Sequence, residues 1–401
     1  IEGVTGVVDS GKVKQMEMAP ASGLDKLETK HVSMASAEQR AGRAGRVRPG
    51  RAVRLWTRAF EHRLDDFDTP EIMRVDVTAL ILEVLAWSGS DPMEFDWFDR
   101  PPGHAIERAV GLLRKLGALE RDGFVLTDLG RQMLDLPAHP RIARMLVEGA
   151  ERGVLRTTAG MAAVLSERDF VLHVDDDAPP GDSDVLRRVE LLDQVGGGHG
   201  GGGRSGMKPH YGRAKRVAQV QRQFQRLLDN RQVDEVDADA PLQALAVGYP
   251  DRICISRGDD RRYVMVGGEP LALAYESIVH DAEFLVAASI GGRVRGRNAG
   301  GVSSRGLIRM ASLARREWLE QLFAQRFDAR VEVEFDEDRE RVMAFEREFF
   351  DDIQLDEKVA SVDDASDPEA VSRMLARHAK QDLEKAFGMG ERDRQFIERL
   401  K

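Results

Sequence analysis

The chain has 401 residues, 42% of them hydrophobic, which is enough for several packed domains. No apolar run approaches the roughly 18 residues of a membrane span, and the first residues lack the basic and apolar regions of a signal peptide, so we expect a soluble, cytoplasmic protein. The single cysteine, Cys254, excludes an internal disulfide, and the nine histidines show no zinc-binding spacing, so no metal site is predicted.

The net charge of −10 does not exclude nucleic acid as a partner, because the charges are segregated along the chain. Residues 40–58 contain seven arginines and no carboxylate, and residues 204–231 are also basic. Acidic residues gather from residue 328 onward. The distribution of charge is therefore more informative than its sum.

The first predicted elements are strands. Val4, Val7 and Val8 indicate a buried strand that ends at Gly11. Residues 12–18 and 27–32 are predicted as two strands, with the segment 19–23 as a hairpin-like connection between them.

A helix is predicted next, with Ser36 as its N-cap and its end before Gly50. At about 100° per residue, Gln39, Arg43 and Arg46 share one face of this helix. That face carries two guanidiniums and an amide, and guanidinium groups match phosphate oxygens closely. The pattern therefore favours a polyanion as the ligand of this face.

Two glycines, Gly42 and Gly45, flank the basic face, and each costs a helix interior roughly 0.8–1.0 kcal/mol relative to alanine. Their spacing suggests that a group approaches this backbone closely. There are two simpler interpretations. Gln39 could serve only a capping box with Ser36, and an arginine-rich helix is often a solvated surface. A solvated helix normally mixes charges of both signs and avoids glycine, so we favour the phosphate interpretation.

Residues 61–137 are predicted to form a winged helix. Thr69 and Pro70 indicate a helix start that leads into apolar positions up to residue 85, and a second helix follows over 106–116. Asp122-Gly123 is typical of a tight hairpin turn between two short strands, and Thr127 is predicted to cap a third helix.

Residues 138–240 show helical patterns over 140–150, 158–165, 185–195 and 214–228, which predict a helical bundle. Residues 196–206 are nearly all glycine and indicate a flexible insertion rather than a phosphate-binding loop, since no Lys-Ser/Thr follows a strand there. The basic helix after it could line a nucleic-acid channel or be ordinary solvated surface.

From residue 246 the pattern changes to short strands at 252–256, 262–266, 283–290 and 306–312, which predict a small barrel within 241–350. The basic segment 291–297 lies between two of them and is a candidate contact for an RNA backbone or a plain hairpin tip. An amphipathic helix near Trp318 and paired strands at 330–335 and 341–346 follow. Beyond residue 351 we expect an acidic, linker-like tail with one helix over 369–387.

One motif gives these elements a family context. The residues 39–46, Gln-Arg-Ala-Gly-Arg-Ala-Gly-Arg, resemble motif VI of superfamily 2 helicases in its DEAH-box form, and Val8-Asp9-Ser10-Gly11 resembles the end of motif V. The later layout resembles that of HrpB-type ATP-dependent RNA helicases. The resemblance implies a multidomain α/β plus α fold. Its parts are the C-terminal part of a RecA-like domain (1–60), a winged helix (61–137), a ratchet bundle (138–240), an OB-like β domain (241–350) and an acidic helical tail (351–401).

The resemblance also implies an activity, the coupling of ATP hydrolysis to movement along single-stranded RNA. Gln39, Arg43 and Arg46 would contact the phosphates of ATP and act in catalysis, with Glu2 beside the ribose. Magnesium would be held mainly by a second RecA-like domain. The hairpin at 12–32 would lie towards the nucleic acid, and the alternative is an ordinary hairpin at the edge of the domain.

No G-x₄-G-K-[ST] or Asp-Glu-x-His sequence occurs in these residues. We therefore expect the chain to be the C-terminal portion of a helicase, without ATPase activity of its own. The alternative is a non-enzymatic nucleic-acid-binding protein built from winged-helix and OB-like modules.

Overall fold

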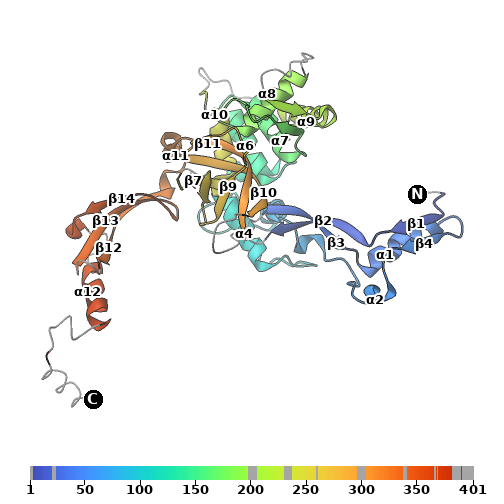
Figure 1. Ribbon diagram of the computed structural model, residues 1–401, viewed down its shortest axis with the longest axis horizontal. Helices are drawn as coiled ribbons and strands as arrows, with labels where there is room; N and C mark the ends of the chain where they lie inside the picture. Colours follow the sequence, from blue (N-terminus) through green and yellow to red (C-terminus); the bar gives the residue numbers. More distant parts are fainter. Residues whose placement is uncertain are drawn as a thin grey trace.

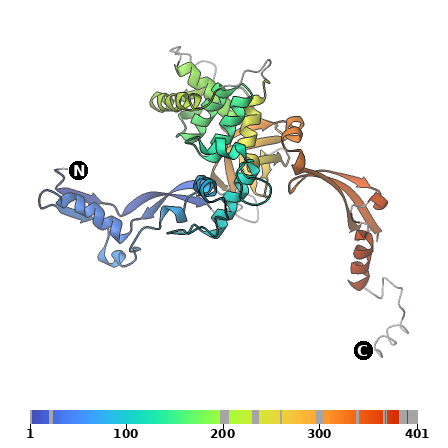
Figure 2. The ribbon, with the colours of Figure 1, turned by 180° about the vertical axis from the view of Figure 1, so that it is seen from behind.

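The computed structural model describes residues 3–19, 24–196, 206–229, 237–258, 261–295, 304–336, 341–364, 367, 369–381 and 390. These residues form three parts along an elongated molecule (Figures 1 and 2). An N-terminal unit lies at one end, a central body of helices and a barrel follows, and a C-terminal sheet lies at the other end.

The N-terminal unit is built on two short parallel strands, β1 (Gly6–Asp9) and β4 (Arg51–Arg54). Helix α1 (Met34–Ala41) packs on both strands and continues into the 3₁₀ turn η1 (Gly42–Gly45). The short helix α2 (Arg58–Glu61) follows.

The predicted hairpin between β1 and α1 is confirmed. It consists of β2 (Lys12–Ala19) and β3 (Leu24–His31), paired antiparallel from Lys12↔His31 onward. It extends from the β1–β4 layer towards the central body (Figure 1). Its connection, residues 20–23, lies outside the described residues.

The winged-helix portion contains α3 (Thr78–Ser88), α4 (Gly103–Lys115) and α5 (Asp128–Leu134). The predicted wing is confirmed by an antiparallel bridge between Leu119 and Leu126, with Gly123 at φ +79° in the turn. Thr127 caps α5 as predicted, because its hydroxyl accepts from Gly130 N at 2.9 Å.

The predicted helix start at Thr69 and Pro70 was wrong. Only a 3₁₀ turn, η2 (Glu71–Met73), forms there, and Pro70 precedes it. The helix begins at Thr78, where the Asp76 carboxylate accepts from the Thr78 N–H at 2.8 Å. The side chain of Asp76 supplies an acceptor for an N-terminal N–H, which is what fixes a helix start.

The helical bundle surrounds a shared core, and its helices pack mainly as α6 on α7 and α10, and α7 on α8 and α9. Their bounds are α6 (Pro140–Glu151), α7 (Leu155–Ser166), α8 (Asp184–Gly196), α9 (Tyr211–Gln225) and α10 (Ala240–Gly248). Two features were not predicted, α10 and the small sheet of β5 (Val171–Val174) with β6 (Met207–Pro209). The glycine-rich stretch 197–205 lies outside the described residues.

The predicted small barrel is confirmed as five strands in the closed order β10-β11-β9-β8-β7. The 3₁₀ turn η3 (Pro250–Arg252) leads into the barrel. The strands are β7 (Ile253–Ser256), β8 (Arg262–Met265), β9 (Pro270–Leu273), β10 (Phe284–Arg295) and β11 (Ser304–Ala314). Strand β9 was not predicted, and the tip of the β10–β11 hairpin, 296–303, lies outside the described residues.

After the barrel, α11 (Arg316–Leu322) and η4 (Ala324–Arg326) lead to a three-stranded antiparallel sheet. Its strands are β12 (Phe327–Asp336), β13 (Arg341–Phe350) and β14 (Ile353–Ala360). The predicted linker character of residues after 351 was wrong here, because β14 pairs along β13. After η5 (Val362–Asp364), α12 (Ala370–Gln381) packs on β12 and β13.

One hydrophobic core runs from the winged helix through the bundle and the barrel wall to the start of the C-terminal sheet, from Val77 to Ile353. A second, smaller core fills the barrel around Leu271, Leu285 and Ile308. The described part of the chain before Val77 buries only three hydrophobic side chains, Val32, Ala37 and Ala44. The N-terminal unit thus has almost no core of its own.

Candidate functional site

The helix that carries the predicted site starts earlier than predicted. Its N-cap is Ser33, whose hydroxyl accepts from Ser36 N at 3.1 Å, so Ser36 lies inside the first turn. The predicted N-cap at Ser36, and with it the capping box to Gln39, was wrong. Because Ser33 caps the helix, Gln39 is not needed to satisfy the helix start, and it is exposed.

The three predicted site residues lie on one continuous helical stretch. Gln39 is in the last turn of α1, Arg43 is in η1, and Arg46 is its C-cap. Residues three apart eclipse one another in a 3₁₀ turn, so Arg43 and Arg46 stand on the same side. The side chains of Gln39, Arg43 and Arg46 make no hydrogen bond or ion pair with a residue that the structure describes. Both guanidiniums are thus available to an anion from outside this unit.

A buried carboxylate anchors this stretch to strand β1. Asp9, at the end of β1, is only 6% exposed and accepts from the Arg40 guanidinium at 3.0 Å and from Gly11 N at 2.9 Å. Arg40 also donates to the carbonyl of Lys12 at 3.2 Å. The sequence analysis assigned no role to Arg40. Its position on a different face of the helix from Gln39, Arg43 and Arg46 could have indicated a contact within the unit. The anchor fixes α1 against the end of the strand.

The glycines of the motif have different surroundings. A Cβ at Gly50 would overlap the carbonyl of Ala44, so Gly50 lets the chain return close under η1. At Gly42 and Gly45 a Cβ would meet no described atom within 4 Å. The described residues therefore contain no group that approaches Gly42 or Gly45, and their backbone faces open space.

The sheet beneath the motif has an uncovered apolar face. Val8 and Val53 are partners in register on β1 and β4, and they are 69% and 51% exposed. Leu55, just after β4, is 63% exposed. Parallel strands normally occur in sheets that are covered on both faces. In this unit the β1–β4 pair is covered by α1, while the face with Val8 and Val53 is uncovered by the described residues.

A second basic surface lies on α9. Arg216 is paired with Glu167 at 2.9 Å, and Arg213 donates to the carbonyl of Asp169. Lys215, Arg222 and Arg226 are exposed, and their side chains make no hydrogen bond or ion pair with any described residue. In the predicted basic segment 291–297, residues 291–295 continue β10 and the last two lie outside the described residues. Glu2 also lies outside them.

Comparison with known proteins shows which proteins this chain resembles. Residues 109–138 match the winged-helix part of the helicase-associated domain HA2, and residues 139–233 match its ratchet-like part. Over 291 residues, 72% of this chain, the sequence is 34% identical to ATP-dependent RNA helicase HrpB of Escherichia coli. The chain is a homologue of HrpB-type DEAH helicases.

Solved structures of HrpB also resemble this chain. A crystal structure of E. coli DExH-box NTPase HrpB superposes with a TM-score of 0.65 at 27% identity, covering 95% of this chain and 42% of that chain. Human probable ATP-dependent RNA helicase DHX34 is 38% identical over 166 residues, which is 41% of this chain and 14% of DHX34. The chain spans 31% of the length of E. coli HrpB.

None of the helices within the described residues is both long enough and apolar enough to span a membrane. The described residues also contain no cluster of histidine, cysteine and carboxylate side chains suited to a metal ion.

Proposed function

We propose that these residues form the C-terminal portion of an ATP-dependent RNA helicase. In that helicase, the N-terminal unit described here forms one side of the ATP site and a P-loop domain forms the other. The observation that carries the proposal is the pair of guanidiniums of Arg43 and Arg46, which have no partner among the described residues. They lie on a helical stretch that the Asp9–Arg40 contact anchors beside an uncovered parallel sheet. An arginine face that is positioned but unpaired fits phosphate recognition.

In this proposal Arg43 and Arg46 stabilise the charge that develops on the transferred phosphoryl group. Arginine fingers of this kind contribute about 10³–10⁵ in rate. Gln39 contacts the terminal phosphate or the attacking water, and Glu2 binds the ribose. The P-loop, the magnesium ligands and the carboxylate that orients water belong to the partner RecA-like domain, because these residues contain no P-loop sequence.

The uncovered face of the β1–β4 sheet supports this arrangement. A unit that buries only Val32, Ala37 and Ala44 gains little hydrophobic stabilisation by itself. Further strands and helices of a RecA-like domain would cover Val8 and Val53 and extend the sheet. The simpler non-enzymatic interpretation leaves this apolar face without an explanation.

We place single-stranded RNA along the basic face of α9 and the β10–β11 hairpin, with the β2–β3 hairpin on its path. Lys215, Arg222 and Arg226 support this because each is exposed and lacks an internal partner among the described residues. Each contact to a phosphate releases counterions, so binding should weaken steeply with salt. The domain limits given above at 60, 137, 240 and 350 remain part of the same proposal.

Fluorescence anisotropy of the 401-residue chain with a labelled single-stranded RNA tests this assignment. Replacing Lys215, Arg222 and Arg226 by glutamine should reduce the slope of log K against log salt by about 2, since each phosphate contact contributes about 0.7 on a single strand. The matched control is Arg216→Gln, because Arg216 is already paired with Glu167. An unchanged slope in the triple variant would remove α9 from the RNA path.

The same preparation tests the ATP assignment. We expect ATP hydrolysis at background level with and without RNA, because these residues provide only one side of the site. RNA-stimulated turnover by the 401-residue chain would refute the proposed division of the site.

A further inference from the structure

An open cavity of about 450 Å³ lies where the winged helix, the bundle and the start of the barrel meet. Asp76 and His139 reach it from the winged-helix side, Arg141 from the first turn of α6, and Tyr249 and Arg252 from the segment between α10 and β7. The cavity thus collects ionisable side chains from three parts of the central body.

Arg252 is the unusual member of this set. Its guanidinium lies over the ring of Tyr249, 5.2 Å from the centroid, and it makes no hydrogen bond or ion pair with a residue that the structure describes. Burial, together with the like charge of Arg141, lowers the pKa of Arg252 to about 10. Arg252 is half-buried, and a partly desolvated cation without a paired anion is costly in a folded protein, because buried charges are usually paired.

The neighbouring charges are already paired with each other. Arg141 forms two hydrogen bonds with the Asp251 carboxylate, at 2.5 and 2.7 Å. Asp76 accepts from the Thr78 N–H at 2.8 Å and faces His139 Nε2 at 3.4 Å. Since His139 Nδ1 accepts from the Arg141 N–H, its hydrogen is on Nε2 and points to Asp76. Among the described residues that line the cavity, Arg252 is therefore the arginine whose guanidinium has no hydrogen-bonded carboxylate.

The helix ends around the cavity have opposite electrostatic effects on a bound anion. The N-terminus of α6, a twelve-residue helix, lines one side with its partial positive charge. The last turn of α7 lines another side with Leu165 and Ser166, and its partial negative charge opposes an anion there. The hydroxyl of Ser166 is exposed and can donate.

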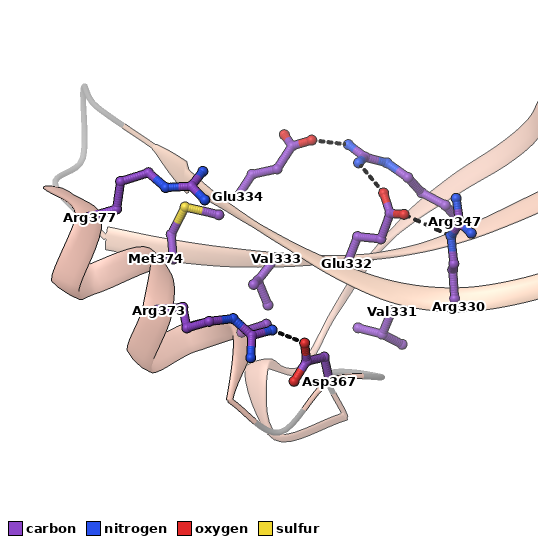
Figure 3. Close-up of a pocket in the computed structure, with 11 residues that line it drawn as sticks. Arg330, Val331, Glu332, Val333, Glu334, Arg347, Asp367, Arg373, Met374 and Arg377 are labelled. Carbon is purple, nitrogen blue, oxygen red and sulfur yellow. Dashed lines mark hydrogen bonds and ion pairs between the residues drawn. The ribbon is translucent and has the colours of Figure 1, made fainter.

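A second cavity is also lined by arginines, but most of them are paired with carboxylates. It has about 540 Å³ and lies between β12, β13 and α12 (Figure 3). There Arg330 and Arg347 both bind Glu332, Arg347 also binds Glu334, and Arg373 binds Asp367 (Figure 3). Because most of its arginines already have carboxylate partners, that cavity offers little to an anion.

We propose that the cavity around Arg252 is a binding site for a phosphate-class oxyanion, with the Arg252 guanidinium as its principal ligand. The oxyanion comes either from the backbone of a bound RNA or from a free phosphate. Only the RNA source rests on the function proposed above. The anion site itself stands on Arg252, the cavity and the absence of a paired carboxylate among the described residues.

Thermal unfolding of the 401-residue chain, with and without inorganic phosphate at constant ionic strength, tests the site. We expect phosphate to raise the Tm of the wild type in proportion to the logarithm of its concentration, and Arg252→Met to lose that rise. The control is Arg121→Met, which removes an exposed arginine from the wing turn and should keep the full rise.

The stability of the variant without phosphate separates a ligand from a structural residue. A guanidinium without a partner contributes no ion pair, so Arg252→Met should have a Tm no lower than the wild type in phosphate-free buffer. Equal phosphate shifts in wild type and Arg252→Met would overturn the proposal. If Arg252→Met fails to fold, Arg252 is structural and the proposal fails, unless Arg252→Gln folds and loses the phosphate response.

Binding of single-stranded RNA distinguishes the two sources. If an RNA phosphate occupies the cavity, Arg252→Met should weaken RNA binding by about tenfold and inorganic phosphate should compete with RNA. If RNA binding is unchanged while the phosphate response is lost, the site takes a free phosphate. That second result supports the anion site even if the proposed RNA function is wrong.

Discussion

Asp184 joins the helical bundle to the barrel, and its removal should loosen that junction. The carboxylate lies at the start of α8, is 1% exposed, and accepts from Ser277 Oγ at 2.6 Å, Ile278 N at 2.9 Å and Ala311 N at 2.8 Å. Asp184→Ala leaves two buried backbone N–H groups without an acceptor. At about 1–3 kcal/mol each, the loss should be about 2–6 kcal/mol, a large part of the stability of a typical domain.

Hydrogen exchange measured by mass spectrometry reports on this junction directly, without assuming that the whole chain unfolds in one step. In Asp184→Ala, peptides covering residues 306–314 should exchange much faster than in the wild type. The matched control is Asp182→Ala, because Asp182 is exposed and its ion pair with Arg315, at 3.5 Å, is worth less than about 1 kcal/mol. Equal protection of 306–314 in wild type and Asp184→Ala would refute the conclusion that this carboxylate holds the bundle and the barrel together.

Three further predictions concern other parts of the chain. Gly50→Ala should destabilise α1 and η1 by about 1–3 kcal/mol through overlap with Ala44, whereas Gly45→Ala should change stability by less than about 0.5 kcal/mol; similar exchange rates for α1 amides in both variants would contradict this. Burial raises the pKa of Asp76, but hydrogen bonds from His139 and Thr78 outweigh it and hold the pKa at about 2, below its ordinary 3.8. Its contribution to the free energy of unfolding, on the order of 2 kcal/mol, is therefore present above pH 4 and lost as the pH falls towards 2. Between pH 4 and pH 2, Asp76→Asn should therefore lose less stability than the wild type, and an equal loss in both proteins would contradict this role of Asp76. Burial raises the pKa of the Cys254 thiol, so a thiol reagent should label it only after unfolding in urea, and rapid labelling of the native chain would contradict its buried position.

Local signals explain what could be predicted from the sequence. The motif at 39–46, the turn at Asp122-Gly123 and the cap at Thr127 each depend on a few adjacent residues, and the last two formed as expected. The shift of the N-cap from Ser36 to Ser33 arose because both are serines three residues apart, and local spacing cannot choose between them.

Elements that depend on distant partners were not predictable in the same way. Helix α10 is buried all round, so it shows no amphipathic period, and it packs on α6 about a hundred residues earlier. Strand β14 carries three consecutive charged residues, Asp356, Glu357 and Lys358, which hide the alternation of a strand, and it is held by pairing along β13 and by the Glu357–Arg347 ion pair at 2.7 Å. Arg40 contacts Asp9 across 31 residues, and Asp184 contacts Ala311 across 127, so neither role is visible in a local pattern.

The central claim is that Arg43 and Arg46 act on ATP held by a P-loop domain. The most direct test is RNA-stimulated ATP hydrolysis by a longer polypeptide that joins these residues to the P-loop domain of an HrpB relative. Arg43→Gln and Arg46→Gln should each lower kcat by about 10³-fold or more. Arg48→Gln, which removes an exposed arginine just beyond Arg46, should leave kcat within a few fold of the wild type. Retention of near-wild-type kcat by either Arg43→Gln or Arg46→Gln would contradict the account.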